Sequence, residues 1–241
     1  ATTTDDDVAG FTIVETDGST EVDESGTTDT FTIVLNAEPT NDVVVLATDS
    51  NDEGEATISG SVTFTSADWD TPQTITVTGV DDSIVDGDQI STITISVVET
   101  ISDDDFDSVA DETVSATTTD DDVAGFTIVE TDGSTEVDES GTTDTFTVVL
   151  DAEPASDVVL TITSDDTGEA TVNSPLTFTS ANWDTPQTIT VTGADDDIID
   201  GTITSTITVA VDAANSDDNF DSVADETVSA TTTDDDVAGF T

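Results

Sequence analysis

The chain has no lysine, arginine, histidine, cysteine or tyrosine, and these absences exclude several classes of function. Without basic side chains it offers no electrostatic footprint for nucleic acid or anionic lipid. Without cysteine it forms no disulfide and no thiolate metal site, and zinc and copper also lose their usual histidine ligand. No ordinary general base remains beyond the carboxylates, and the acidic loops lack the aromatic-lined cleft expected of a glycosidase. We therefore predict that the protein is not an enzyme.

Long apolar runs are absent as well. No segment approaches the roughly 20 apolar residues that a membrane-spanning helix needs. The sequence therefore predicts no membrane insertion.

What the chain does have is acid: 57 Asp and Glu side chains give a formal net charge of −57 over 241 residues. Charge of one sign repels itself in the folded state. Even so, 34% of the residues are hydrophobic, and they lie in short blocks rich in Val, Ile, Thr and Phe that are typical of β-strands. The chain can therefore bury a core, and bound cations or a saline medium must supply the counter-charge.

The apolar blocks recur with turn residues between them, and within them apolar and polar residues alternate, as in Phe31, Ile33 and Leu35 against Thr30 and Thr32. Such alternation gives a strand one buried and one exposed face. The strands predicted in the first repeat are 10–14, 30–35, 42–48, 55–59, 62–65, 73–80, 91–98 and 112–118. This many short strands in about 110 residues predicts an all-β fold, a two-sheet antiparallel sandwich of immunoglobulin-like type.

The sequence is an internal repeat. ATTTDDDVAGFT begins at Ala1, at Ala116 and at Ala230, and TSADWDTPQTITVTGVDD returns as TSANWDTPQTITVTGADD. A period near 115 residues suits a domain rather than a solenoid turn. We predict tandem domains at 8–122 and 123–236, with 1–7 ending a preceding repeat and 237–241 starting a third.

The acids cluster between the predicted strands. Alternate loops of a sandwich lie at the same end, so separate clusters can meet in space. Carboxylates brought together without basic partners raise one another's pKa. A hard cation such as Ca²⁺, which takes six to eight oxygen ligands, relieves that repulsion. We therefore predict Ca²⁺ as the bound ion; the alternative is that these are only solvated loops of an acidic protein.

Three segments in this order resemble the Calx-β family, the calcium-binding sandwich of sodium–calcium exchangers and long bacterial surface proteins. VDESGTTDTFTIVL at 22–35 is similar to the family's first long strand with its early glutamate. GVDDSIVDGD at 79–88 is similar to its acidic loop, and TTDDDVAGFT at 118–127 to its aspartate run between domains. The wider repeat is most similar to tandem repeats of giant secreted bacterial adhesins.

The resemblance implies a calcium site at one end of each domain. In the first copy it implies as ligands Glu24, Asp81, Asp82, Asp86, Asp120, Asp121 and Asp122, with Asp52 as a looser match. In the second copy it implies Glu139, Asp195, Asp196, Asp200, Asp234, Asp235 and Asp236, with Asp166 as the looser match. Gln89 and Ile203 stand where the family often has a further glutamate, so we expect fewer ions than in a full member. Asp197 keeps an acid that Ser83 replaces, which makes the second site the richer one.

Function follows from repetition and calcium together. Near-identical tandem sandwiches serve length and stiffness, so we predict a calcium-stiffened structural segment of an extracellular filament or adhesin stalk at the cell surface. Its expected partners are neighbouring repeats and identical chains in a filament. The alternative is an adhesive module that recognises a surface carbohydrate or protein. Trp69 and Trp183 could stack on such a ligand, but we favour a role as corner anchors before a strand.

Overall fold

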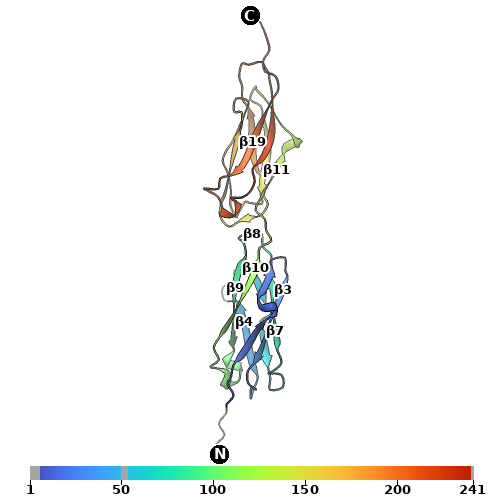
Figure 1. The fold of residues 1–241 in the computed structure, drawn as a ribbon. Helices are drawn as coiled ribbons and strands as arrows, with labels where there is room; N and C mark the ends of the chain where they lie inside the picture. The colour runs from blue at the N-terminus through green and yellow to red at the C-terminus, as the bar shows by residue number, and fades with distance from the viewer. Residues whose placement is uncertain (1–5, 50–53, 240–241) are drawn as a thin grey trace, which may run out of the picture. The chain divides into compact units, whose positions relative to one another are not determined.

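A computed structural model of the chain describes residues 6–49 and 54–239. The chain divides into two units (Figure 1). The first comprises Ala1–Asp82 and Gly87–Asp121, and the second comprises Ser83–Asp86 and Asp122–Thr241. The boundaries predicted from the repeat, 8–122 and 123–236, remain predictions.

The first unit contains two sheets. The four-stranded sheet has the order β1 (Phe11–Glu15), β3 (Thr28–Leu35), β7 (Gln73–Gly79), β5 (Ala56–Ile58). The five-stranded sheet has the order β2 (Thr20–Asp23), β10 (Glu112–Thr119), β9 (Gln89–Val97), β4 (Val43–Asp49), β6 (Ser61–Phe64). Short 3₁₀ turns are η1 (Thr16–Gly18), η2 (Glu99–Ile101) and η3 (Asp104–Phe106). Adjacent strands are antiparallel except β2 and β10, which are parallel.

The second unit repeats this plan. Its sheets have the orders β11 (Phe126–Glu130), β13 (Thr143–Leu150), β18 (Gln187–Gly193), β16 (Ala170–Val172) and β12 (Thr135–Asp138), β20 (Glu226–Thr233), β19 (Ile203–Val211), β15 (Val158–Ser164), β17 (Leu176–Phe178). Its 3₁₀ turns are η4 (Thr131–Gly133) and η5 (Asp218–Phe220). A further two-stranded ladder joins β8 (Ile84–Val85) to β14 (Glu153–Pro154) in parallel.

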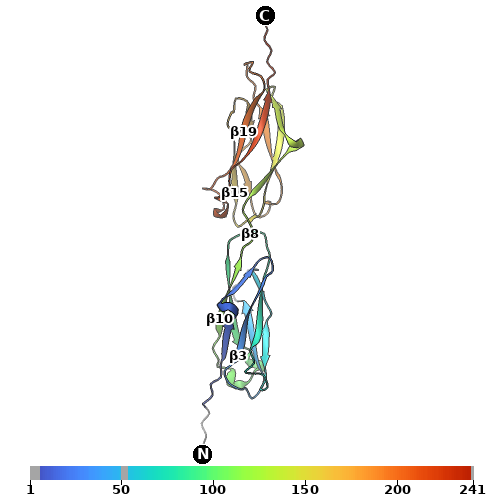
Figure 2. The ribbon, with the colours of Figure 1, turned by 45° about the vertical axis from the view of Figure 1, so that its right-hand side comes forward.

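Each unit consists of strands that form two sheets (Figure 2), and each has its own hydrophobic core. In the first unit, Phe31 and Ile33 of one sheet and Ile93 and Ile95 of the other are fully buried in one cluster. Alternate residues, largely threonines, point outward, so the exposed strand faces are mainly polar apart from single residues such as Val14 and Ile90. The fold is therefore an all-β sandwich, as predicted, with no α-helix in the described residues.

All eight strands predicted in the first repeat are present, and their ends differ by at most two residues. Strand β2 was not among the predicted strands, and the 22–35 motif that resembles a first long strand is divided between β2 and β3. Gly26 has φ +89°, and the Ser25 amide donates to Asp23 Oδ1. The resulting turn ends β2 and sends β3 into the opposite sheet.

Trp69 and Trp183 have corresponding places in the two units. Each is partly buried against the core, and its carbonyl accepts a hydrogen bond from the last residue of a strand, Leu35 or Leu150, at 3.1 Å. These contacts support the role of a corner anchor.

Gly193 closes β18 against the end of β12. A Cβ atom at this position would lie 2.2 Å from the backbone oxygen of Asp138. The first unit has the same close approach, with a Cβ on Gly79 lying 2.1 Å from Asp23 O. Since a backbone oxygen cannot rotate away, only glycine lets the two sheets approach here.

We expect Gly193→Ala to destabilise the second unit by about 1–3 kcal/mol or more, because the methyl group forces backbone apart. Gly239→Ala is the matched control, because its nearest atom would be at 3.9 Å. Chemical denaturation followed by circular dichroism measures the difference. Equal midpoints for the two variants would contradict the packing.

Candidate metal centre

The parallel pairing of β12 with β20 places Glu139 beside an aspartate run. Both strands end at the same edge, and the Glu139 amide donates to Thr233 O at 3.1 Å. The residues that directly follow the two strands are therefore Glu139, after β12, and Asp234, after β20. The first unit has the same arrangement, with Glu24 N donating to Thr119 O at 3.2 Å.

Glu169 is fixed from both sheets of the second unit. Its carbonyl accepts a hydrogen bond from the Ala194 amide at 2.8 Å, just after β18, and another from Thr232 Oγ1 at 3.2 Å, in β20. Its side chain is only 6% exposed. Glu169, which directly precedes β16, is therefore held at the edge where Glu139 lies.

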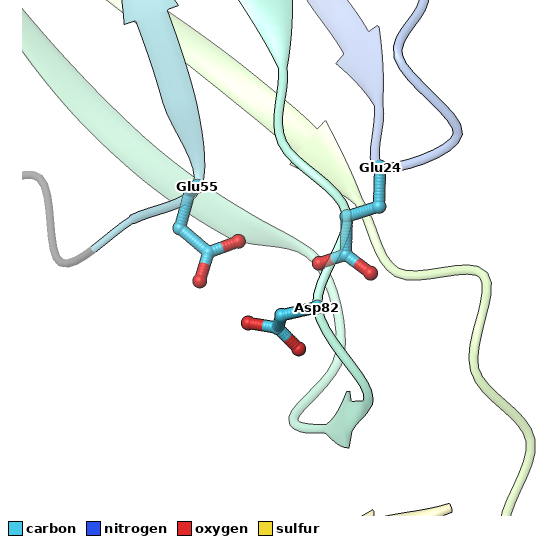
Figure 3. A group of neighbouring side chains, drawn as sticks. All are labelled: Glu24, Glu55 and Asp82. Carbon is cyan, nitrogen blue, oxygen red and sulfur yellow. The ribbon is translucent and has the colours of Figure 1, made fainter.

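Carboxylate oxygens converge at this edge. In the second unit, Glu139 groups with Asp234 and Asp236 and also with Glu169 and Asp200, the ligand atoms of each group lying within 4.8 Å of one another. In the first unit, Glu24, Glu55 and Asp82 form such a group. Figure 3 shows the three carboxylates turned toward one another from the end of β2, the start of β5 and the loop after β7.

Several of these oxygens are buried without a hydrogen bond. They are both carboxylate oxygens of Glu139, Glu169 Oε2, Asp236 Oδ2 and Glu24 Oε2. Glu24 and Glu139 are each only 1% exposed. A buried carboxylate without a partner is strongly unfavourable, and a chain with no basic residue has no side chain to neutralise it.

The carboxyl pKa values shift accordingly. Burial, then the charge of Asp120, raises the pKa of Glu24 to about 7. Burial, then Asp234, raises the pKa of Glu139, and burial, then Asp200, raises the pKa of Glu169. Burial, then Asp197, raises the pKa of Asp236. Four acids at matching edges are thus held in surroundings that oppose their charged form.

The donor set suits a hard cation. Carboxylate oxygens from several loops match the ligands and the flexible geometry that Ca²⁺ accepts. Zinc and copper favour nitrogen and sulfur ligands, and the chain has no histidine or cysteine to provide them. The orphaned buried oxygens are therefore compatible with Ca²⁺.

The structure brings together some, but not all, of the ligands that the resemblance implies. Glu24, Asp82, Glu139, Asp200, Asp234 and Asp236 lie in the groups above. Asp120 accepts a hydrogen bond from Gly87 N at 2.7 Å and adds to the field at Glu24. Asp196 accepts from Ile198 N at 2.6 Å, and Asp166 accepts from Gly168 N at 3.0 Å.

The remaining predicted ligands are placed as follows. Asp81, Asp195 and Asp235 are exposed. Asp121 is also exposed, but one of its carboxylate oxygens lies in a further group with Glu24. Asp86 and Asp122 belong to the second unit. Asp52 lies outside the described residues.

Sequence reasoning missed Glu55 and Glu169. Each stands in the repeated sequence Gly-Glu-Ala-Thr, directly before a short strand. An acid that both copies keep at a strand start, beside a buried alanine, was the available signal.

Comparison with known proteins identifies fold-level likeness only. No protein-family profile matches the chain, and no curated protein sequence matches it. Similar solved structures include CBD12 from CALX1.2, at 13% identity and a TM-score of 0.34 over 91% of this chain and 99% of that one. Domains 5–6 of the S-layer protein SbsC match at 20% identity and a TM-score of 0.30 over 95% and 100% of the two chains. The E. coli chaperone DraB matches at 8% identity and a TM-score of 0.35 over 85% and 93%. These values are too low to support a conclusion about function.

The raised pKa of Glu24 predicts how metal-free stability depends on pH. A carboxyl group whose folded pKa lies above its unfolded value stabilises the fold when protonated, and this contribution is lost as pH rises from 4.5 to about 7. We expect Glu24→Gln, which mimics the protonated form, to unfold at a higher denaturant concentration than the wild type at pH 8 in chelator. At pH 4.5 the advantage should vanish.

Glu99→Gln is the control for this prediction, because it removes the same charge from an exposed side chain. Urea titrations at both pH values give the comparison. If the urea midpoints of the two variants rise equally at pH 8, the gain in stability comes from a general reduction of negative charge and not from the burial of Glu24.

Proposed function

We propose that this chain is a calcium-binding structural repeat segment of an extracellular filament or adhesin stalk. The observation that carries the proposal is the set of buried carboxylate oxygens without hydrogen-bond partners, in a chain without a basic side chain. A bound cation supplies the missing charge, and the oxygen-only donor set favours Ca²⁺.

Glu139 is the central ligand of the proposed site in the second unit, because both carboxylate groups of that unit contain it. Asp234 and Asp236 approach from the segment after β20, Glu169 from the residue before β16, and Asp200 from the loop between β18 and β19. Calcium supplies positive charge there and ties together segments from both sheets. In the first unit, Glu24, Glu55 and Asp82 take the corresponding roles.

A structural role is supported by the repetition itself. Two sandwiches with matching strand orders and matching acidic edges serve length, as in arrays whose units contact only their neighbours. We further propose that the segment is not catalytic, because its acids form a cation site and its sequence has no other base. In the described residues no helix is long and apolar enough to cross a membrane. Extracellular calcium is abundant enough for weak sites to be filled.

Calcium should raise the melting temperature. Binding to the folded state alone contributes RT ln(1 + [L]/Kd), so about 10 mM calcium and a Kd of about 10⁻⁴ to 10⁻³ M give roughly 1.4–2.7 kcal/mol per site. We expect Glu139→Gln to abolish the calcium-induced increase for the second unit. Differential scanning calorimetry in calcium and in chelator measures it.

Glu226→Gln is the matched control, since Glu226 is exposed at the start of β20. It should retain the wild-type calcium response. An unchanged response in Glu139→Gln would show that the ligands are misassigned, and no response in the wild type would refute the calcium site.

Stiffening is the finer part of the proposal, and it has its own test. Calcium removes like-charge repulsion within segments that lead from one repeat to the next, so we expect a narrower distribution of particle dimensions with calcium than with chelator. Small-angle scattering on one sample in both conditions measures this distribution, with Glu139→Gln and Glu24→Gln combined as the metal-site variant. Coincident wild-type profiles would show that calcium binds without stiffening the chain.

A further inference from the structure

Ile198 and Ile199 form an exposed apolar pair within the acidic loop of the second repeat. Their side chains are 60% and 56% exposed, and neither residue lies in a strand. Their counterparts in the first repeat, 114 positions earlier, are Ile84 and Val85. These differ sharply in environment, because Val85 is only 9% exposed and belongs to the core cluster of the second unit.

The surface that Ile84 and Val85 contact, here called their seat, shows what such a pair binds. As β8 (Figure 1), they pair in parallel with β14, with Ile84 opposite Glu153 and Val85 opposite Pro154. The Glu153 amide donates to Ser83 O at 2.6 Å. Asn219 Nδ2 donates to Val85 O, also at 2.6 Å. The segment is thus held by strand addition and by burial of its apolar side chain.

The first unit carries the counterpart of this seat as an open cavity of about 310 Å³. Its lining includes Ala37, Glu38, Pro39 and Phe106, which correspond to Ala152, Glu153, Pro154 and Phe220 of the second unit. Glu38 and Pro39 lie in no strand, and Glu38 is exposed. The chain therefore carries one exposed apolar pair and one open seat of matching sequence.

We infer that Ile198 and Ile199 dock on the 37–39 seat of another copy of this repeat, which a second copy of this chain supplies. The occupant is a second copy because the segment that fills the equivalent seat in the second unit has the same Asp/Ser-Ile-apolar-Asp sequence. Donor and seat are different surfaces of one chain, so the contact is head-to-tail and not the self-complementary contact of a two-fold dimer. The inference goes beyond the proposed calcium site and does not require it.

One substitution between the copies sets the strength of docking. Asn219, which donates to the docked segment, is replaced in the first unit's seat by Asp105. A carboxylate cannot donate this hydrogen bond, and it repels the carbonyl that would face it. Asp105→Asn should therefore strengthen the association by about 2- to 10-fold, the value of one net hydrogen bond.

Disulfide trapping tests the docking on the full chain, which has no cysteine of its own. Residues Ile84 and Glu153 are register partners, so Ile198→Cys on one copy should meet Glu38→Cys on another within disulfide reach. The two variants are mixed under mild oxidation, and the heterodimer is quantified against both homodimers. Val129→Cys, at a site 57% exposed, is the matched control donor.

We expect Ile198→Cys to trap Glu38→Cys several-fold faster than Val129→Cys does. Adding Asp105→Asn to the acceptor should raise the rate, and adding Ile199→Asp to the donor should lower it to the control level. Equal trapping by Ile198→Cys and Val129→Cys, or a heterodimer yield that Ile199→Asp leaves unchanged, overturns the inference.

Trapping is measured in calcium and in chelator. Specific trapping in either condition supports docking, whatever the outcome of the calorimetric calcium test. Specific trapping combined with no calcium-induced rise in melting temperature would remove the calcium proposal and leave docking in place. A calcium-induced rise in melting temperature without specific trapping would remove the docking inference and leave the calcium proposal in place.

Discussion

The buried glutamates are the constraint on which the rest of the structure depends. Glu24 and Glu139 are placed at the edge of a sheet by parallel strand pairing, which is a property of the backbone register and not of their charge. The register brings each against an aspartate run, and the chain contains no cation to compensate. A fold of this kind carries a local electrostatic cost that only a solute cation or a proton can relieve. The pKa of about 7 at Glu24 expresses that cost in the metal-free state.

The electrostatic cost is limited to the segments between strands, because most of the acidic residues lie there. Strand residues that face outward are mainly threonines, while acids concentrate between strands. The sheets therefore form from ordinary apolar and hydroxyl side chains, and fully buried phenylalanines such as Phe31 and Phe146 stabilise each core independently of metal. We therefore expect the sandwich to fold without a bound cation, unlike small domains that are unfolded without their metal.

The sequence allowed the strands to be predicted well, because alternation and turn residues are local signals. It allowed the acidic edge to be predicted in outline, since Glu24, Asp82, Glu139, Asp200, Asp234 and Asp236 all lie in carboxylate groups. Strand β2 escaped prediction because its four residues, Thr20–Asp23, include a single apolar side chain, Val22. The ladder of β8 with β14 escaped because Ile84 and Val85 and their partners are far apart in sequence. Glu55 and Glu169 escaped because the repeated Gly-Glu-Ala-Thr marks their positions but does not show that they lie beside Glu24 and Glu139, which is a tertiary property.

The acidic edge and the exposed isoleucines of the second unit are physically connected. Asp196 accepts a hydrogen bond from Ile198 N at 2.6 Å, and Asp234 accepts one from Gly201 N at 2.8 Å. The apolar pair therefore lies on a short span that acids of the candidate metal centre hold at both ends. A cation that orders these acids lowers the number of conformations open to the span and so the entropy lost when it docks. Neutralising the acids also weakens repulsion toward another strongly acidic copy. Calcium therefore does not bind at the docking contact itself. It favours that contact because it restricts the segment that carries Ile198 and Ile199 and reduces the repulsion between the acidic copies.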